Sequence, residues 1–246
     1  MSLALGLATS ALGQAASSPP SPKPDADAIA ALNKMGEALR ALTAFTVSAD
    51  VTTEDVLDNG QKLQYAGDLK IEARRPSGFK IYMNAEHQER VLYYDGKSVT
   101  VFAPKIGYYA SVAAPPTIAA TLDVTRDKYG IEFPLADLFS LGTDPTLIAR
   151  IKDGFNVGPD TVGGLSCQHY AFRQEAVDWQ VWIRTDGPAL PCKMVITTTD
   201  DPAQPQYTAV MRWEADKAPP QADYTFKPPA DAHRITVAEV SAASVK

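Results

Sequence analysis

The stretch from Gly164 to Thr197 concentrates the residue types that can do chemistry. It holds both cysteines of the chain, one of its three histidines and two of its three tryptophans. Three kinds of site use such residues: a nucleophile with its base, a metal centre, or a disulfide that ties a scaffold together. The spacing of the residues decides among these three.

Catalysis would need a nucleophile and a base within hydrogen-bond reach of each other. Ser166, beside Cys167 and His169, is the only local grouping that offers both. Side chains of a strand alternate between its two faces, so Ser166 lies opposite His169 and the pair fails geometrically. His87 and His233 are distant in sequence, and no HExxH, GxSxG, CxxC or glycine-rich phosphate motif is present. We therefore predict no catalytic residue and no enzyme.

A metal centre could draw on Cys167, His169 and Cys192, with His233 as a fourth ligand. However, a Cys-x-His pair with one distant cysteine is not a standard structural zinc spacing. We predict no metal site and no cofactor, and we interpret His169 as an exposed residue on the polar face of its strand.

The amino terminus resembles a secretory signal peptide or its remnant over residues 1–16. Its apolar run, Leu3 to Leu12, is too short to span a bilayer, and Gly13-Gln14-Ala15 provides the small residues that a signal peptidase accepts. The basic residues that normally precede such a run are missing, so a start codon assigned too late and a hydrophobic remnant are the alternatives. Four prolines within 17–24 indicate that residues 17–27 form a flexible linker. We expect an exported, periplasmic protein that does not span the membrane.

Export favours a disulfide between Cys167 and Cys192, because the periplasm is oxidising. If the strands around them form a meander, the two cysteines lie at the same end of the sheet, about two strand spacings or roughly 10 Å apart. This separation exceeds the ~7 Å limit between bridged Cα atoms. The loop 186–191 would have to fold Cys192 back over the end of the middle strand.

Two regions of alternating hydrophobicity predict strands that are joined by short turns. The first region predicts Phe45–Leu57, Lys62–Arg74, Phe79–Asn84, Glu89–Tyr94, Ser98–Phe102 and Tyr108–Val112. The pattern resumes at Phe155 and predicts Leu165–Arg173, Val177–Thr185, Lys193–Thr199, Gln206–Ala215 and a short Asp223–Pro229. About 10–11 antiparallel strands are more than an open sheet carries without curling.

Helical patterns occur at the start and in the middle of the chain. Apolar residues at spacings of three and four predict a first helix after Asp25, through Ile29, Leu32, Met35, Leu39 and Leu42. Residues 117–129, 134–141 and 145–151 predict three more, between the two strand regions. The predicted fold is therefore α+β: a strongly curved antiparallel sheet, or incomplete β-barrel, with an N-terminal helix and a helical lid inserted mid-chain.

Several segments, in this order, carry a resemblance to a known family: "RRPSGF" from Arg74, "LYYDGKSVTVF" from Leu92, "FPLADLF" from Phe133 and "FKPPADA" from Phe226. They resemble landmarks of the LolA/LolB-like periplasmic lipoprotein carriers. The last third, with "CQHYAFR", "VDWQVWI" and "LPCK", resembles more closely an uncharacterised family of predicted periplasmic proteins, domain of unknown function 2092, assigned to the same fold. The resemblance covers residues 28–237, which we interpret as a single domain, with 238–246 as a C-terminal tail.

The resemblance implies an apolar cavity between lid and sheet, which in the carriers receives lipoprotein acyl chains. Alternation independently places apolar side chains on one face of several predicted strands. The expected lining residues are Leu69, Ile71, Phe79, Ile81, Met83, Ile118, Leu122, Leu138, Trp179, Val181 and Ile183. The alternative interpretation of the same stripes is a core that lid side chains fill completely.

The charge distribution narrows the class of ligand and partner. The net charge is −6, and 23 basic residues are spread among 29 acidic ones without a Lys/Arg cluster, which argues against nucleic acid. Arg74 and Arg75 could face an anionic headgroup at the rim, or form a solvated strand end. We expect a non-enzymatic carrier of a hydrophobic ligand such as a lipid or lipoprotein acyl chain. The alternative is an envelope sensor or interaction module that binds an envelope protein partner without a ligand cavity.

Overall fold

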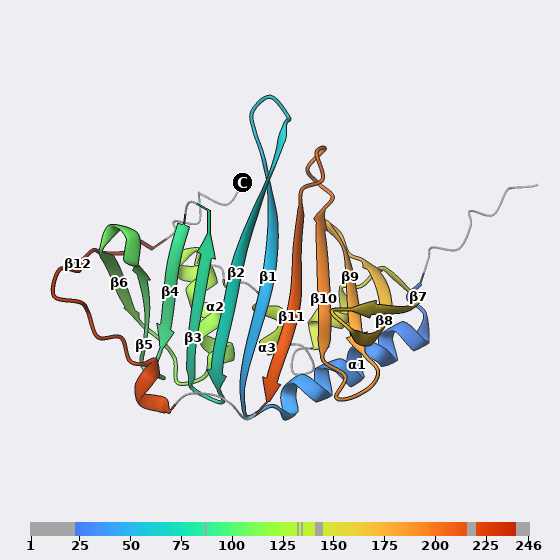
Figure 1. Cartoon of the computed structure of the whole chain (residues 1–246), viewed down its shortest axis with the longest axis horizontal. Helices are drawn as coiled ribbons and strands as arrows, with labels where there is room; N and C mark the ends of the chain where they lie inside the picture. The colour runs from blue at the N-terminus through green and yellow to red at the C-terminus, as the bar shows by residue number, and fades with distance from the viewer. Residues whose placement is uncertain are drawn as a thin grey trace, which may run out of the picture.

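The structure, a computed structural model, describes residues 23–86, 88–131, 133, 135–140, 145–215 and 220–239. The expected signal peptide, most of the linker and residues 240–246 of the tail lie outside these described residues. Within them, twelve strands form one sheet, in the order β12-β6-β5-β4-β3-β2-β1-β11-β10-β9-β8-β7 (Figure 1). All neighbours are antiparallel except β12 and β6.

The sheet consists of two antiparallel meanders that meet at its centre. The first contains β1 (Ala44–Val56), β2 (Lys62–Arg74), β3 (Gly78–Ala85), β4 (Gln88–Tyr94), β5 (Ser98–Ala103) and β6 (Tyr108–Ala113). The second contains β7 (Asp153–Val162), β8 (Leu165–Arg173), β9 (Val177–Arg184), β10 (Pro191–Thr198) and β11 (Gln206–Ala215). They are joined where β1 pairs with β11, from Phe45 opposite Ala215 to Thr53 opposite Tyr207.

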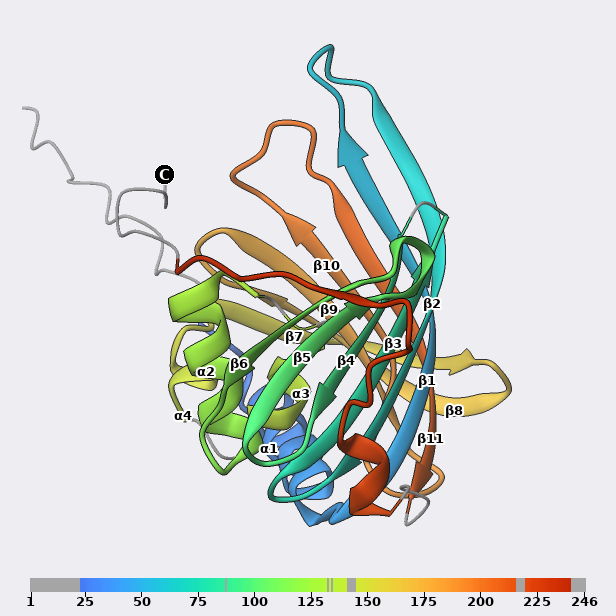
Figure 2. The same cartoon turned by 90° about the vertical axis from the view of Figure 1, so that its left-hand side faces the viewer.

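The helices lie on the concave side of this curved sheet (Figure 2). They are α1 (Ala26–Ala41), α2 (Ile118–Tyr129), α3 (Asp137–Ser140) and α4 (Pro145–Ala149), and we call the last three, together with the described residues between them, the lid. Thr117 caps α2, because its hydroxyl oxygen accepts from the Ala120 amide at 3.4 Å. Gly130 ends α2 with a φ of 62°, a left-handed conformation that glycine adopts without steric cost.

The main hydrophobic core fills the space between the sheet and the helices. It takes Leu32, Met35 and Leu39 from α1, Ile118 and Leu122 from α2, and the inward-facing apolar residues of the strands. Each fully buried side chain of this size contributes about 1.5–3 kcal/mol. The helices are therefore held by their apolar faces, as the spacing of those residues predicts.

A second, smaller core lies on the convex side of β8 to β10. Trp179, Val181 and Ile183 of β9 belong to the main core, whereas the intervening Trp182 packs with Cys167, Cys192 and Val195 on the opposite face. The period of two in a strand requires this division. The predicted inward direction of Trp179, Val181 and Ile183 is thus confirmed.

The predicted architecture is confirmed, with three differences in the strands. Strand β7, at the point where the alternating pattern resumes, and the two-residue strand β12 (His233–Arg234) were not among the eleven predicted strands. The predicted strand Asp223–Pro229 is wrong: a 3-10 turn, η2 (Gln221–Tyr224), is followed by residues outside any strand. Pro228 and Pro229 lack the amide hydrogens that a sheet ladder needs, which explains the difference.

Residues 220–239, here the C-terminal strap, run along the convex face instead. Tyr224 is completely buried, and the Phe226 ring lies 5.0–5.3 Å from the rings of Tyr93, Phe102 and Tyr109. Farther along, β12 pairs with β6, the last strand of the first meander, and Glu239 forms an ion pair with Lys128 of α2 at 2.7 Å. The strap therefore connects the convex face with the lid.

Candidate functional site

A mouth cavity of about 350 Å³ opens on the concave face, over β1 to β4 and the adjoining β11. Its inner walls are mostly apolar, and its rim carries Asp55, Glu86, Gln88 and Arg90. The strand residues that line it are Val51, Thr53, Tyr65, Asp68, Leu69, Met83, Asn84, Ala85 and Tyr207. The rim is thus charged with both signs, whereas the interior is suited to hydrocarbon.

Two inner cavities, each of about 230 Å³, lie under the lid. The first is lined by Phe133, Leu135, Ala136, Leu138, Met194, Ile196 and Tyr207. The second is lined by Leu32, Met35, Leu138, Leu147, Ile148, Arg150, Ile151, Gln174, Val177, Trp179, Met194 and Ile196. Apolar side chains from the lid and α1 face apolar side chains of β9 and β10 across this space.

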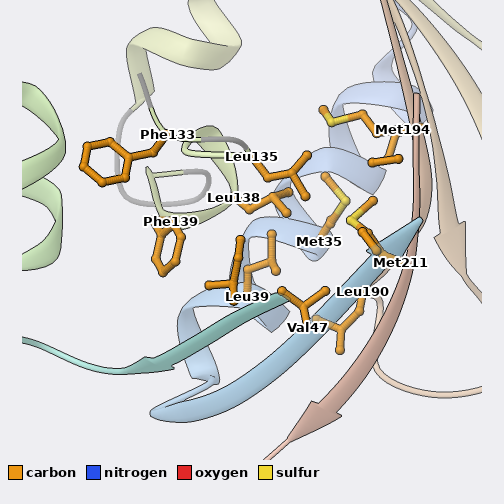
Figure 3. Close-up of a cluster of buried hydrophobic side chains, with 14 of the residues drawn as sticks. Met35, Leu39, Val47, Phe133, Leu135, Leu138, Phe139, Leu190, Met194 and Met211 are labelled. Carbon is orange, nitrogen blue, oxygen red and sulfur yellow. The ribbon is translucent and has the colours of Figure 1, made fainter. Parts of the chain in front are cut away.

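The three cavities adjoin along the concave face, and we call them together the channel. Tyr207 lines both the mouth cavity and the first inner cavity. Leu138, Met194 and Ile196 line both inner cavities. Figure 3 shows Leu135 and Leu138 pointing from the lid toward Met35 and Met194, which form the opposite wall. The shared residues therefore place the three cavities one after another, from the mouth to the space between α1 and α4.

Local sequence explains how these side chains reach the channel. Met194 and Ile196 are two residues apart on β10, so they share its concave face, as Tyr207 and Ala209 do on β11. Leu135 lies in the lid with a φ of 55°, a left-handed conformation that costs a non-glycine residue about 1–2 kcal/mol. Its side chain is buried at the first inner cavity, and this burial offsets the cost.

The structure separates the eleven predicted lining residues into two groups. Leu69 and Met83 line the mouth cavity, Leu138 lines both inner cavities, and Trp179 lines the second. The other seven are buried in the main core without lining any of these cavities: Ile71, Phe79, Ile81, Ile118, Leu122, Val181 and Ile183. Lid side chains thus fill part of the half-barrel and leave the channel in the rest.

Several channel residues were not predicted as lining residues, although they lie in predicted strands. Met194, Ile196 and Tyr207 lie within the predicted strands Lys193–Thr199 and Gln206–Ala215, and alternation could have placed them on one face. Phe133 and Leu135 lie in the lid outside regular helix, where no periodicity reveals their direction.

Arg75 contacts the lid and is not a solvated strand end. Both terminal nitrogens of its guanidinium lie 3.5 Å from the Phe139 carbonyl oxygen, and the group sits 5.8 Å from the centre of the Phe139 ring. Partial burial lowers the pKa of Arg75 from its ordinary value. This residue thus links the end of β2 to α3.

The disulfide between Cys167 and Cys192 is confirmed, but by a different route from the one expected. A register shift between Pro191 and Lys193, rather than a folded-back loop, brings Cys192 toward Cys167. The Cα atoms are 7.1 Å apart, so the bond joins β8 to β10 across β9. With both thiols consumed, the Cys/His set weighed as a metal centre no longer has free thiolates.

His169 is half-buried, which corrects its interpretation as an exposed residue. Its ring stacks on Trp182 with 3.8 Å between centroids, and Nε2 lies 3.0 Å from the Gln180 side-chain oxygen. Desolvation chiefly lowers its pKa, opposed by the Gln180 hydrogen bond and the Asp160 charge. Among the described residues, no three His, Cys, Asp or Glu side chains gather closely enough to hold a metal ion.

The fold and its cavities define an incomplete β-barrel with a helical lid on its concave side. The chain belongs to the family described as "Predicted periplasmic protein (DUF2092)", whose model matches residues 28–238. The predicted periplasmic location is confirmed by this family assignment. In the part of the chain that the structure describes, no helix has the length and apolarity needed to cross a membrane.

A comparison with solved structures finds similar chains at low sequence identity. The lipoprotein LppX of Mycobacterium tuberculosis is similar with a TM-score of 0.52 and 14% identity, over 79% of this chain and 98% of LppX. LprF from Mycobacterium bovis is similar with a TM-score of 0.47 and 15% identity, over 86% of this chain and 100% of LprF. A LolA superfamily protein from Nitrosomonas europaea is similar with a TM-score of 0.35 and 9% identity, over 81% of this chain and 97% of that protein. A search of curated proteins found no match. The likeness to LppX shows a common fold.

Proposed function

We propose that this chain is a non-enzymatic periplasmic binding or carrier protein for a hydrophobic ligand, such as a lipid or the acyl chains of a lipoprotein. The adjacency of the three cavities carries the proposal, because neighbouring cavities that share lining residues together offer an elongated and mostly apolar space. Its walls come from both meanders, α1 and the lid, so binding would involve most elements of the domain.

The size of the hydrophobic effect makes this binding physically reasonable. Each methylene group transferred from water to an apolar site contributes about 0.8 kcal/mol. About ten methylenes would supply roughly 8 kcal/mol before the entropic cost of association is subtracted. A charged rim beside an apolar interior suits an amphiphile, whose polar end can remain in contact with water.

A channel-blocking substitution tests the proposal. Ile196→Trp places a larger side chain where both inner cavities share a wall, so it should fill the channel and reduce uptake of a fluorescent fatty acid at least tenfold. Val210→Trp is the matched control, because Val210 lies on the neighbouring strand β11, directly opposite Lys193, and lines none of the three cavities. It should bind like the wild type.

Native mass spectrometry of the protein, purified without detergent, provides the second measurement. We expect a bound amphiphile in the wild type and in Val210→Trp, and none in Ile196→Trp. If the delipidated wild type takes up no fatty acid and is purified without any amphiphile, the proposed function is wrong.

One observation favours the alternative function, an envelope protein-interaction module. Phe155 and Val157 of β7 are about half exposed, at 50% and 49%, on the strand that ends the sheet. Exposed apolar residues on an edge strand suit a protein partner. Crosslinking in the cell envelope should then recover one stable partner, and Phe155→Asp should abolish its capture while lipid uptake remains unchanged.

A further inference from the structure

The Tyr207 side chain lines both the mouth cavity and the first inner cavity, so it lies between them. The hydroxyl oxygen is buried and has no hydrogen-bond partner among the described residues. Burial also raises the pKa of this phenol to about 12, so the group keeps its proton at any physiological pH. A buried donor without an acceptor is unfavourable, which points to an acceptor that none of the described residues supplies.

The surroundings of Tyr207 restrict the chemistry of that acceptor. The first inner cavity is otherwise lined by Phe133, Leu135, Ala136, Leu138, Met194 and Ile196, none of which carries a charge. A carboxylate or phosphate at this depth would lose its hydration and gain only one neutral donor, which does not compensate for the loss. A neutral carbonyl oxygen is satisfied by a single hydrogen bond.

We propose that Tyr207 donates a hydrogen bond to the neutral carbonyl of an ester or amide in a bound acyl amphiphile. The acyl chain then occupies the inner cavities, and the polar remainder of the ligand lies at the mouth, near Asp55, Glu86 and Arg90. This inference rests on the proposed function, and adds to it the ligand class and the residue that selects it.

The test compares two ligands of equal chain length, methyl hexadecanoate and hexadecyl methyl ether, which differ in the carbonyl group. Binding is measured by displacement of the neutral fluorophore N-phenyl-1-naphthylamine. We expect the wild type to bind the ester about tenfold more tightly than the ether, because only the ester supplies a strong acceptor. Tyr207→Phe keeps the ring and removes the hydroxyl, so it should bind both ligands equally.

Tyr82→Phe is the matched control. The Tyr82 hydroxyl donates to Glu89 at 3.4 Å, and Tyr82 lines none of the three cavities, so this variant should keep the tenfold preference. Hexadecanoate, as the anion, should bind the wild type more weakly than the ester does. Since the substitution removes an unpaired buried hydroxyl, the ligand-free Tyr207→Phe variant should melt no lower than the wild type.

The outcomes separate this inference from the proposed function. An undiminished ester preference in Tyr207→Phe, a lower melting temperature of that variant, or tighter binding of hexadecanoate than of the ester each overturns the inference and leaves the carrier function intact. Failure of the wild type to bind either the ester or the ether overturns both.

Discussion

At the scale of single residues, the cysteines, His169 and Trp182 of the stretch from Gly164 to Thr197 make structural contacts. The Trp182 indole donates to the Asp160 carboxylate at 2.7 Å, stacks on His169, and lies 4.5 Å from the Lys193 ammonium, measured to the ring centroid. The disulfide between Cys167 and Cys192 packs against the same ring. This convex cluster ties β7, β8, β9 and β10 together, which explains why so many reactive residues fall in one stretch of sequence.

The disulfide should contribute measurably to stability. The double variant Cys167→Ala/Cys192→Ala opens a loop with a sequence separation of 25, which should lower the free energy of unfolding by about 3 kcal/mol. Denaturant unfolding measures this loss, and the reduced wild type should unfold at nearly the same concentration as the variant. Two titratable thiols in the non-reduced, denatured wild type would disprove the bond.

His169 should make stability depend on pH. Burial lowers its folded-state pKa below the ordinary 6.5, so the unfolded chain takes up the proton first as the pH falls. The contribution of neutral His169 to the free energy of unfolding is fully present above pH 6.5 and is lost as the pH falls through the folded-state pKa. Between about pH 7 and pH 5, the wild type should therefore lose stability more steeply than His169→Gln. Parallel pH profiles of the unfolding free energy would contradict this assignment.

At the scale of elements, the lid is anchored to the sheet near its first helix and contacts it farther on through Arg75. The Pro115 carbonyl accepts hydrogen bonds from the Tyr94 hydroxyl at 2.6 Å and the Thr121 hydroxyl at 3.1 Å, while the Ile118 amide donates to the Pro76 carbonyl at 2.9 Å. These bonds hold the start of α2. Beyond α2, the guanidinium of Arg75 meets the Phe139 carbonyl, and apolar side chains of the lid pack into the main core.

The C-terminal strap should stabilise the first meander from the convex side. Phe226→Ala removes a ring that contacts three aromatic residues of β4, β5 and β6, so the free energy of unfolding should fall by about 2 kcal/mol. Phe155→Ala is the control, because its ring is half exposed and its loss should cost less than about 0.5 kcal/mol. Equal losses in urea unfolding would show that the strap adds no stability.

At the scale of the whole molecule, the channel lies where the two meanders meet. The mouth cavity takes residues from β1 to β4 and from β11, so it crosses the β1–β11 pairing that joins the two halves. The inner cavities continue under the lid along β10. Curvature of a single sheet therefore creates the site, and the helices determine how much of the enclosed space stays open.

The alternation of apolar and polar residues was sufficient to predict much of this fold from the sequence alone. A period of two assigned most strands, their antiparallel order and the inward face of Trp179, Val181 and Ile183, because these properties depend on neighbours along the chain. The apolar stripe of α1 and the position of the lid between two strand regions followed from equally local patterns. The pairing of Cys167 with Cys192 followed from the compartment and from their number.

Only the tertiary structure decided which of the inward-facing residues meet open space. Ile81 and Met194 have the same pattern in sequence, yet Ile81 is covered within the core and Met194 lines the channel. The unpartnered hydroxyl of Tyr207 and the register shift beside Cys192 were likewise invisible to alternation. The physical reason is that cavities, hydrogen-bond partners and distances between remote strands depend on how the sheet curves and how the lid packs. Those quantities are set by contacts between segments far apart in sequence.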